Sequence, residues 1–312
     1  ALNIVPIAST PWTNAGTIGQ TGGTLGLGGT FNSTTITDPG RFSRSSGAVN
    51  LVGTMLGNLQ LDNALGSWNL LGGTIRNGTF SIAAGSTSKL AGPTTNSSLD
   101  KVFLNSPMAL TTNGNNVTVT ALNGLTLNTS QPMGTASLTT NTIFQFQGTQ
   151  TLRTDGGGEF VFTGSVGNII RQVTNGSVLT IDSGVTIRGI YGTVGASNAA
   201  LINKGSILAQ GNTAQTFNVV FGDGSRNDGT IAGTSAWLRV FGTSNGIWSN
   251  LGTISNGAGG SLQIGIQSSE TWTNYGTISA LGSTLRFAGG GAAVPFAAAA
   301  AAAPPAVTLA AL

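Results

Sequence analysis

The sequence contains no cysteine and no histidine. Without cysteine, the chain has no disulfide framework, no thiolate nucleophile and no Cys-ligated metal. Without histidine, it lacks the commonest general base and metal ligand, and a Ser–His–Asp triad is excluded. The missing cysteines do not argue against secretion, because a long repetitive core can be stable without disulfides.

Charged residues are also scarce, at 7% of the chain, where about a quarter is usual. The 12 basic and 9 acidic side chains give a net charge of +3, and the basic ones are scattered. Nucleic-acid binding requires concentrated neutralisation of phosphates, so we expect no nucleic-acid partner. No apolar stretch free of glycine and proline is long enough to cross a membrane, so no transmembrane segment is expected.

What the sequence does contain is a short phrase that recurs four times, at residues 202–207, 226–231, 249–254 and 273–278. The asparagine of each phrase is separated from the next by 24, 23 and 24 residues. A fixed period of this size is typical of one small structural unit stacked on itself. The four asparagines are Asn203, Asn227, Asn250 and Asn274.

The phrase Asn-x-Gly-Thr-Ile alternates an apolar isoleucine with a polar threonine, which predicts a strand with one buried face. Glycine fits the corner before the strand, and the asparagines are expected to stack at a turn. A second strand is predicted in each period, at 218–221, 237–240, 262–264 and 284–287. The predicted fold is all-β, a right-handed parallel β-helix of roughly a dozen coils with about 22–24 residues per coil.

The repeat extends over most of the chain, because the phrase at 12–18 nearly duplicates the phrase at 272–278. We therefore predict an N-terminal strand or cap at 1–11, β-helix repeats at 12–290 and an Ala/Pro-rich tail at 291–312. The tail breaks sharply from the composition before it. It could be a linker, a cap or an arm that pairs with a neighbouring molecule.

Acidic residues provide little for catalysis or metal binding. Asp155 and Glu159 flank three glycines, and glycoside hydrolysis requires two carboxylates about 5–9.5 Å apart. The segment from Asp223 to Gly229 superficially resembles a calcium loop, but its glycine is one place late and no bidentate glutamate follows. We therefore predict no enzymatic activity, no catalytic or metal-binding residues and no cofactor.

Two outward-facing columns could still serve binding. Tryptophans open several repeat phrases and are expected to stack at coil corners, with a platform for sugar rings as the alternative. Threonines of the repeat are expected to point outward, as in ice-binding ladders, although Ser206 interrupts their column. The tryptophans are Trp12, Trp68, Trp248 and Trp272, and the threonines are Thr230, Thr253 and Thr277.

The phrases at 12–18, 22–31 and 66–75 resemble the β-strand repeats of large bacterial surface proteins. These are the autotransporter passengers and the filamentous-haemagglutinin-like adhesins, and the likeness covers most of residues 12–290. The resemblance implies a right-handed β-helix and export from the cell. We accordingly expect an extracellular or cell-surface location.

The expected function is that of an extracellular structural β-solenoid that assembles head to tail into a filament or a surface layer. Its principal partner would be another copy of itself, because both ends of a β-helix leave backbone groups unpaired. The alternative is an adhesin segment that binds carbohydrate or a host-cell ligand. An ice-binding protein and a polysaccharide-degrading enzyme are less favoured.

Overall fold

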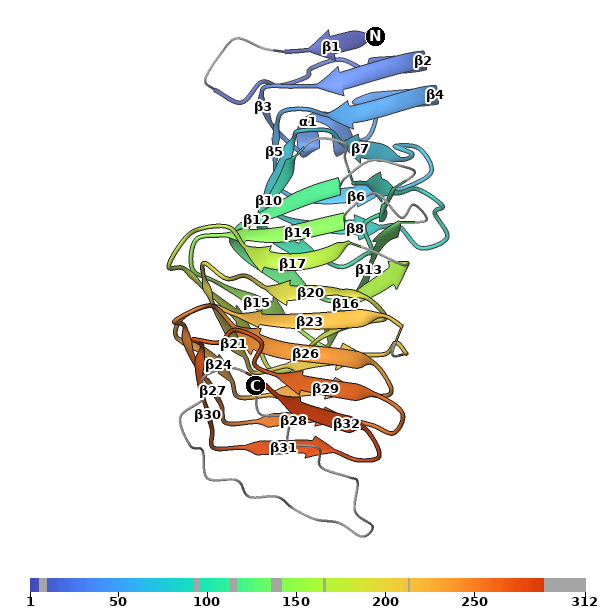
Figure 1. Ribbon diagram of the computed structural model, residues 1–312. Helices are drawn as coiled ribbons and strands as arrows, with labels where there is room; N and C mark the ends of the chain where they lie inside the picture. Colours follow the sequence, from blue (N-terminus) through green and yellow to red (C-terminus); the bar gives the residue numbers. More distant parts are fainter. Residues whose placement is uncertain are drawn as a thin grey trace.

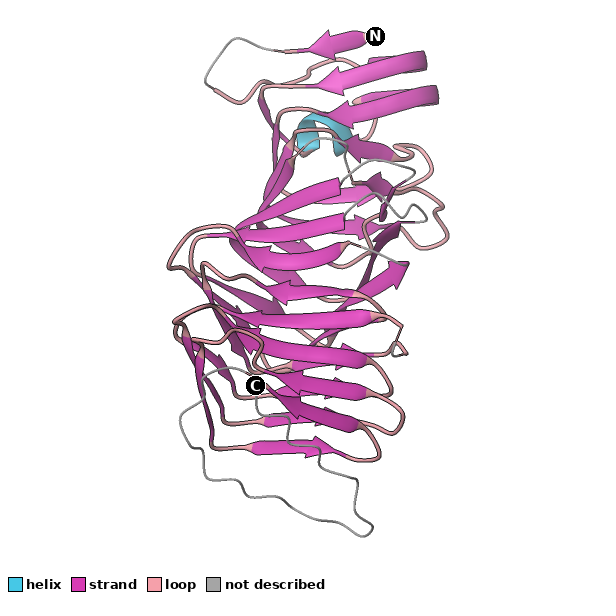
Figure 2. Cartoon of the chain, in the orientation of Figure 1, coloured by secondary structure: helices cyan, strands magenta, loops and turns pink. Residues whose placement is uncertain are grey.

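The computed structural model describes residues 1–5, 10–92, 96–112, 117–135, 142–164, 167–212 and 214–288. It is an all-β parallel solenoid of about 11 turns (Figure 1). The described residues contain one short helix, α1 (Thr34–Thr37), near the N-terminal end (Figure 2). The predicted parallel β-helix of roughly a dozen coils is confirmed, while the predicted tail at 291–312 lies outside the described residues.

Three parallel ladders run along the solenoid and form three faces, because each coil pairs strand by strand with the next. Face 1 consists of β3 (Thr30–Asn32), β5 (Thr54–Leu56), β14 (Thr142–Gln147), β17 (Asn168–Gln172), β20 (Gly192–Gly195), β23 (Thr216–Phe221), β26 (Trp237–Gly242), β29 (Ser261–Ile264) and β32 (Thr284–Phe287). Face 2 consists of β6 (Leu59–Leu61), β15 (Gln150–Thr154), β18 (Val178–Ile181), β21 (Ala200–Asn203), β24 (Ser225–Asn227), β27 (Ile247–Asn250) and β30 (Thr271–Asn274).

Face 3 is formed by two sheets that an isolated bridge between Ala91 and Ala109 joins into one ladder. It consists of β1 (Leu2–Ile4), β2 (Ile18–Leu27), β4 (Phe42–Leu51), β7 (Trp68–Leu70), β9 (Leu90–Ala91), β11 (Leu110–Thr112), β13 (Ser130–Thr135), β16 (Gly158–Gly164), β19 (Val185–Gly189), β22 (Ser206–Ala209), β25 (Thr230–Gly233), β28 (Thr253–Asn256) and β31 (Thr277–Ala280).

Three long strands turn the corner between faces 1 and 2 without a break: β8 (Thr74–Ile82), β10 (Ser97–Leu104) and β12 (Val117–Leu127). Each contains a residue in the left-handed region at its bend, namely Asn77 (φ 53°), Lys101 (φ 54°) and Asn123 (φ 56°). The first half of each strand therefore pairs on face 1 and the second half on face 2. In later coils this corner is a loop between two shorter strands.

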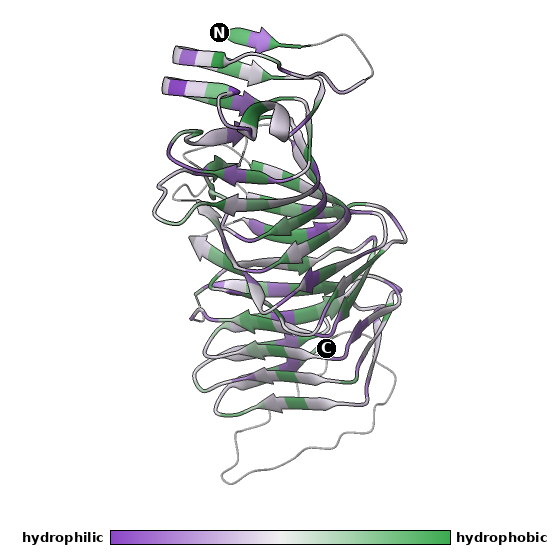
Figure 3. Cartoon of the chain, turned by 180° about the vertical axis from the view of Figure 1, so that it is seen from behind, coloured by the Kyte–Doolittle hydropathy of each residue, from purple (hydrophilic) through white to green (hydrophobic). Residues whose placement is uncertain are grey.

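The core lies between the faces and is filled by every second residue of each strand. On face 3, Ile207, Ile231 and Ile254 are paired in register and fully buried. Figure 3 shows the apolar and polar positions alternating along the strands. The predicted alternation of inward isoleucine and outward threonine is therefore confirmed.

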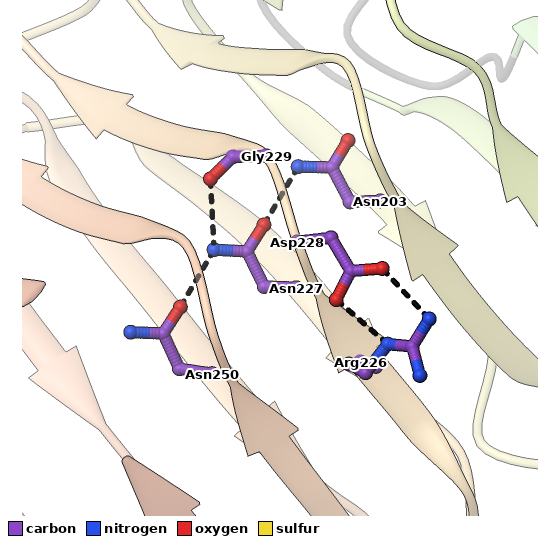
Figure 4. A network of polar contacts seen from close by, with 6 residues as sticks. All are labelled: Asn203, Arg226, Asn227, Asp228, Gly229 and Asn250. Carbon is purple, nitrogen blue, oxygen red and sulfur yellow. Dashed lines mark hydrogen bonds and ion pairs between the residues drawn. The ribbon is translucent and has the colours of Figure 1, made fainter. Parts of the chain in front are cut away.

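The asparagines of the repeat form a ladder at the corner between faces 2 and 3 (Figure 4). The Asn203 side-chain amide donates to Asn227 Oδ1 (2.8 Å), and Asn227 donates to Asn250 Oδ1 (2.7 Å). Asn250 donates in turn to Asn274 Oδ1 (2.7 Å). The first three side chains are completely buried, so the ladder satisfies polar groups that would otherwise destabilise the core. The asparagines thus have the structural role that the sequence predicts.

Candidate functional surfaces

The structure gives Glu159 an ion-pair partner rather than a catalytic one. Glu159 lies on face 3 and holds Arg188 of the next coil through two contacts of 2.6 and 2.9 Å. The hydrogen bond from Arg188 lowers the pKa of Glu159, whereas a catalytic acid requires a raised one. Asp155 is exposed in the turn before β16. This pair therefore lacks the electrostatics of a glycosidase site.

The residues that resemble a calcium loop lie at two different corners of one coil. Asp223 precedes β24 and accepts a hydrogen bond from the Ile247 N–H (2.9 Å). Asp228 follows β24 and forms an ion pair with Arg226 (2.6 Å; Figure 4). Across the described residues, no group of three or more acidic side chains is placed to hold a metal ion. Each carboxylate has a structural partner instead.

Three of the four tryptophans that open the repeat phrases are buried in the core. Trp68, Trp248 and Trp272 are only 0%, 1% and 6% exposed, so they cannot form the alternative platform for sugar rings. Trp248 and Trp272 stack with ring centroids 5.6 Å apart. Trp12 is half-buried over Phe31 (4.8 Å) at the N-terminal end.

The threonine column on face 3 is more continuous than the sequence suggests. Ser206 is in register between Thr186 and Thr230, so it belongs to the column and does not interrupt it. The next outward column on this face is mixed, and a second threonine column is absent from these described strands. That second column contains Arg188, Leu208, Ala232, Ser255 and Ser279.

A groove of about 870 Å³ opens beside α1. Among the described residues, no strand pairs with the outer edge of β6, so face 2 begins there. Ile36, Phe42 and Leu65 contribute the apolar lining. Asp62, which also lines the groove, accepts the Ala64 and Leu65 N–H groups (2.9 and 2.7 Å), so its carboxylate holds the local turn.

Glu270 is a fully buried carboxylate that the sequence does not single out. It accepts hydrogen bonds from the backbone N–H groups of Gly242 (2.6 Å) and Ile266 (3.0 Å). Burial raises the pKa of Glu270, in opposition to these hydrogen bonds. These hydrogen bonds fix the loop between β29 and β30 against the end of β26. The corresponding position one coil earlier is Gly246, so the period does not predict a buried carboxylate here.

The last described coil has the same arrangement of strands as the interior coils, but its apolar side chains are less buried. Asn274 donates to the Gly276 carbonyl (3.0 Å) and stands at the end of the ladder. Ile278 and Leu285 are half-buried, whereas their counterparts Ile254 and Leu262 one coil earlier are fully buried. In the described part of the chain, β31 pairs on one side only, with β28.

None of the helices in the described residues is long and apolar enough to cross a membrane. The chain has the fold of a β-solenoid repeat protein, as its resemblance to β-strand repeats implies. A comparison of the sequence and structure with known protein families, curated proteins and solved structures found no match.

Proposed function

We propose that this protein is an extracellular structural solenoid that assembles end to end and acts without catalysis. The observation that carries the proposal is the unpaired outer edge of β31, within the described residues, directly below a ladder of repeated coils. An open row of backbone groups is a template for another chain. The extracellular location rests on the resemblance of the repeats to exported β-strand repeats.

The two ends of face 3 are complementary in their backbone chemistry. At the C-terminal end, the Thr277 N–H donates to the carbonyl of Gly252, which precedes β28, and the Leu281 N–H donates to the carbonyl of Asn256, the last residue of β28. By alternation along the strand, the N–H and C=O groups of Ile278 and Ala280 point away from the solenoid. At the N-terminal end, the Ile4 carbonyl accepts a hydrogen bond from the N–H of Gly28, which follows β2, so by alternation the N–H and C=O groups of Asn3 point outward. Both are edges of one parallel ladder, and they can pair when two copies stack.

Such a contact joins two different surfaces, so it does not close on itself and produces a filament. The stacked asparagine and tryptophan columns support this arrangement, because both end at the same coil as β31. A second copy would extend the apolar core over Ile278 and Leu285. The burial of these side chains would contribute to the association.

The experiment is electron microscopy and sedimentation of the purified protein beside the variant Ala280→Pro. Proline removes an N–H that points to the open edge and leaves every hydrogen bond to β28 in place. We expect filaments from the parent and short or absent filaments from the variant. Ala280→Thr, which keeps the donor, is the matched control. Monodisperse monomers from the parent at all concentrations would contradict the proposal.

The alternative function, an adhesin that binds carbohydrate, no longer has Trp68, Trp248 and Trp272 as exposed platforms. Trp237, at an outward position on face 1, is a tryptophan that can still contact a sugar ring in this alternative.

A further inference from the structure

Face 1 carries a strip of polar and aromatic side chains over its last four coils. The outward positions of β23, β26, β29 and β32 are paired in register across the coils. One column, which we call the arginine strip, contains Asn218, Arg239, Gln263 and Arg286. The column beside it contains Thr216, Trp237, Ser261 and Thr284.

The arginine strip is positively charged and is not neutralised within the described residues. Arg76, Arg188 and Arg226 have carboxylate partners elsewhere on the solenoid. Arg239 and Arg286 form no ion pair with any described residue, and the two columns contain no acidic side chain. Arg286 is exposed, and the other three side chains of the strip are half-buried. A surface strip of one sign attracts ligands of the opposite sign.

The side chains around Arg239 are arranged for recognition. The Arg239 guanidinium lies over the Phe241 ring, 5.7 Å from its centroid, which restricts its orientation. Trp237 lies two residues before it on the same outward side of β26. Stacked coils are about 4.8 Å apart, so Arg239 and Arg286 stand about 10 Å apart along the axis with Gln263 between them.

We propose that the arginine strip binds an extended acidic polysaccharide that lies along the solenoid axis. Carboxylate or sulfate groups on alternate sugars would pair with Arg239 and Arg286. The side-chain amide of Gln263 can bond the sugar hydroxyls between the two arginines, and the amide of Asn218 can bond those beyond Arg239. Trp237 offers an aromatic surface to a sugar ring at the side of the strip.

A polysaccharide fits this strip better than a nucleic acid does. Two arginines two coils apart neutralise few phosphates, and affinity for nucleic acid depends on many such contacts. Widely spaced charges beside amide and aromatic side chains match a chain with many hydroxyls in which every second unit presents a charge to the strip. This inference does not depend on end-to-end assembly, because face 1 lies along the side of the solenoid.

The test is a titration of the purified protein with polygalacturonate, which is carboxylated, and with heparin, which is sulfated. Neutral dextran and a DNA duplex serve as comparison ligands. We expect binding to at least one acidic polymer, no binding to dextran, and weakening as salt screens the charges. Arg239→Gln combined with Arg286→Gln should weaken binding by about tenfold or more. Trp237→Ala should weaken it as well.

Arg153→Gln is the matched control, because Arg153 is an exposed arginine on face 2 without a described carboxylate partner. Its affinity should equal that of the parent. Thermal melting verifies that each variant is folded. If the double variant melts early, Arg286→Gln alone tests the strip at an exposed position. The proposal is overturned if neither acidic polymer binds, if Arg153→Gln weakens binding equally, or if DNA binds more tightly.

Discussion

Asn227 occupies the middle of the asparagine ladder, with one neighbouring amide on each side (2.8 and 2.7 Å). Asn227→Ala would remove one hydrogen bond from each neighbour in a dry environment, so that Asn203 keeps only its bond to the Thr230 carbonyl and Asn250 Oδ1 loses its donor. We expect a loss of about 2–4 kcal/mol in the free energy of unfolding, measured by urea titration with tryptophan fluorescence. Asn274→Ala, at the end of the ladder, disturbs one neighbouring amide and should cost clearly less. Equal losses would show that the ladder is not what stabilises this corner.

The buried carboxyl group of Glu270 leads to a prediction about how the stability of the fold depends on pH. Its pKa is raised by burial, so the folded state holds this proton more tightly than the unfolded chain does. Its contribution to stability is present below the ordinary glutamate pKa and is lost as the pH rises through the raised value. As the pH rises through this range, we expect Glu270→Gln to lose less stability than the parent. Melting temperature measured against pH tests this.

The Glu159–Arg188 pair acts in the opposite direction, since the pKa of Glu159 is lowered. Its stabilisation is present above the ordinary glutamate pKa and is lost as the pH falls through the lowered value. Glu159→Gln is therefore the control for Glu270→Gln. Identical pH profiles for Glu270→Gln and the parent would contradict the assignment to Glu270.

The structural role of a single residue is predictable from the sequence when every coil repeats that residue. Ile231, Asn227 and Gly229 recur in each period, and the structure gives them the predicted roles. Glu270 and Trp237 each serve one coil only, so no column points to them. The burial of Glu270 depends on how the loop between β29 and β30 folds inward, which no local pattern in the sequence encodes.

Among the elements, the corner before each face 3 strand depends on a column of glycines. A Cβ at Gly252 would overlap the Gly229 carbonyl oxygen of the coil before it. Gly252→Ala should therefore push two coils apart and cost about 1–3 kcal/mol, measured by chemical unfolding. Gly19→Ala is the control, because a Cβ there meets no atom within 4 Å. A comparable loss in both variants would contradict this role of the glycine column, because the effect of alanine on the unfolded chain favours folding.

The strands of the regular coils are largely predictable. The segments expected as second strands correspond to β23, β26, β29 and β32, and the Thr-Ile phrases correspond to β25, β28 and β31. The bends of β8, β10 and β12 are not predictable in this way. Asn77 and Lys101 adopt left-handed conformations that side-chain-bearing residues disfavour, and coils on either side impose them.

Over the whole molecule, each coil contacts mainly its neighbours, so protection from hydrogen exchange should decrease toward the ends. In monomeric protein we expect the Ile278 and Ala280 amides, on the open edge of β31, to exchange rapidly. The Ile231 and Ile254 amides, within interior coils, should exchange slowly. Assembly should protect the β31 amides, and mass spectrometry of exchanged peptides measures the change. Unchanged rates in filaments would place the contact elsewhere.

The number of coils follows from the period and the length, and about 11 turns agree with the expected dozen. The period does not predict the structure of the two ends of the solenoid, because it reflects only the contacts that every interior coil shares. At the N-terminal end, Trp12 covers Phe31 and donates its Nε1 to the Gly28 carbonyl (2.9 Å). Trp12 opens a repeat phrase, but its pairing with Phe31 on face 1 differs from the place of Trp248 and Trp272 on face 2, and α1 has no counterpart in the repeat.

The constant register of the asparagine ladder also has a genetic consequence. A tandem duplication of the 24 codons between Asn203 and Asn227 would insert a coil whose neighbours above and below already fit it. The rod would become longer at unchanged cross-section, and each amide would still find a partner of the same kind. Length is thus the dimension of this molecule that mutation can change most freely, in steps of one coil.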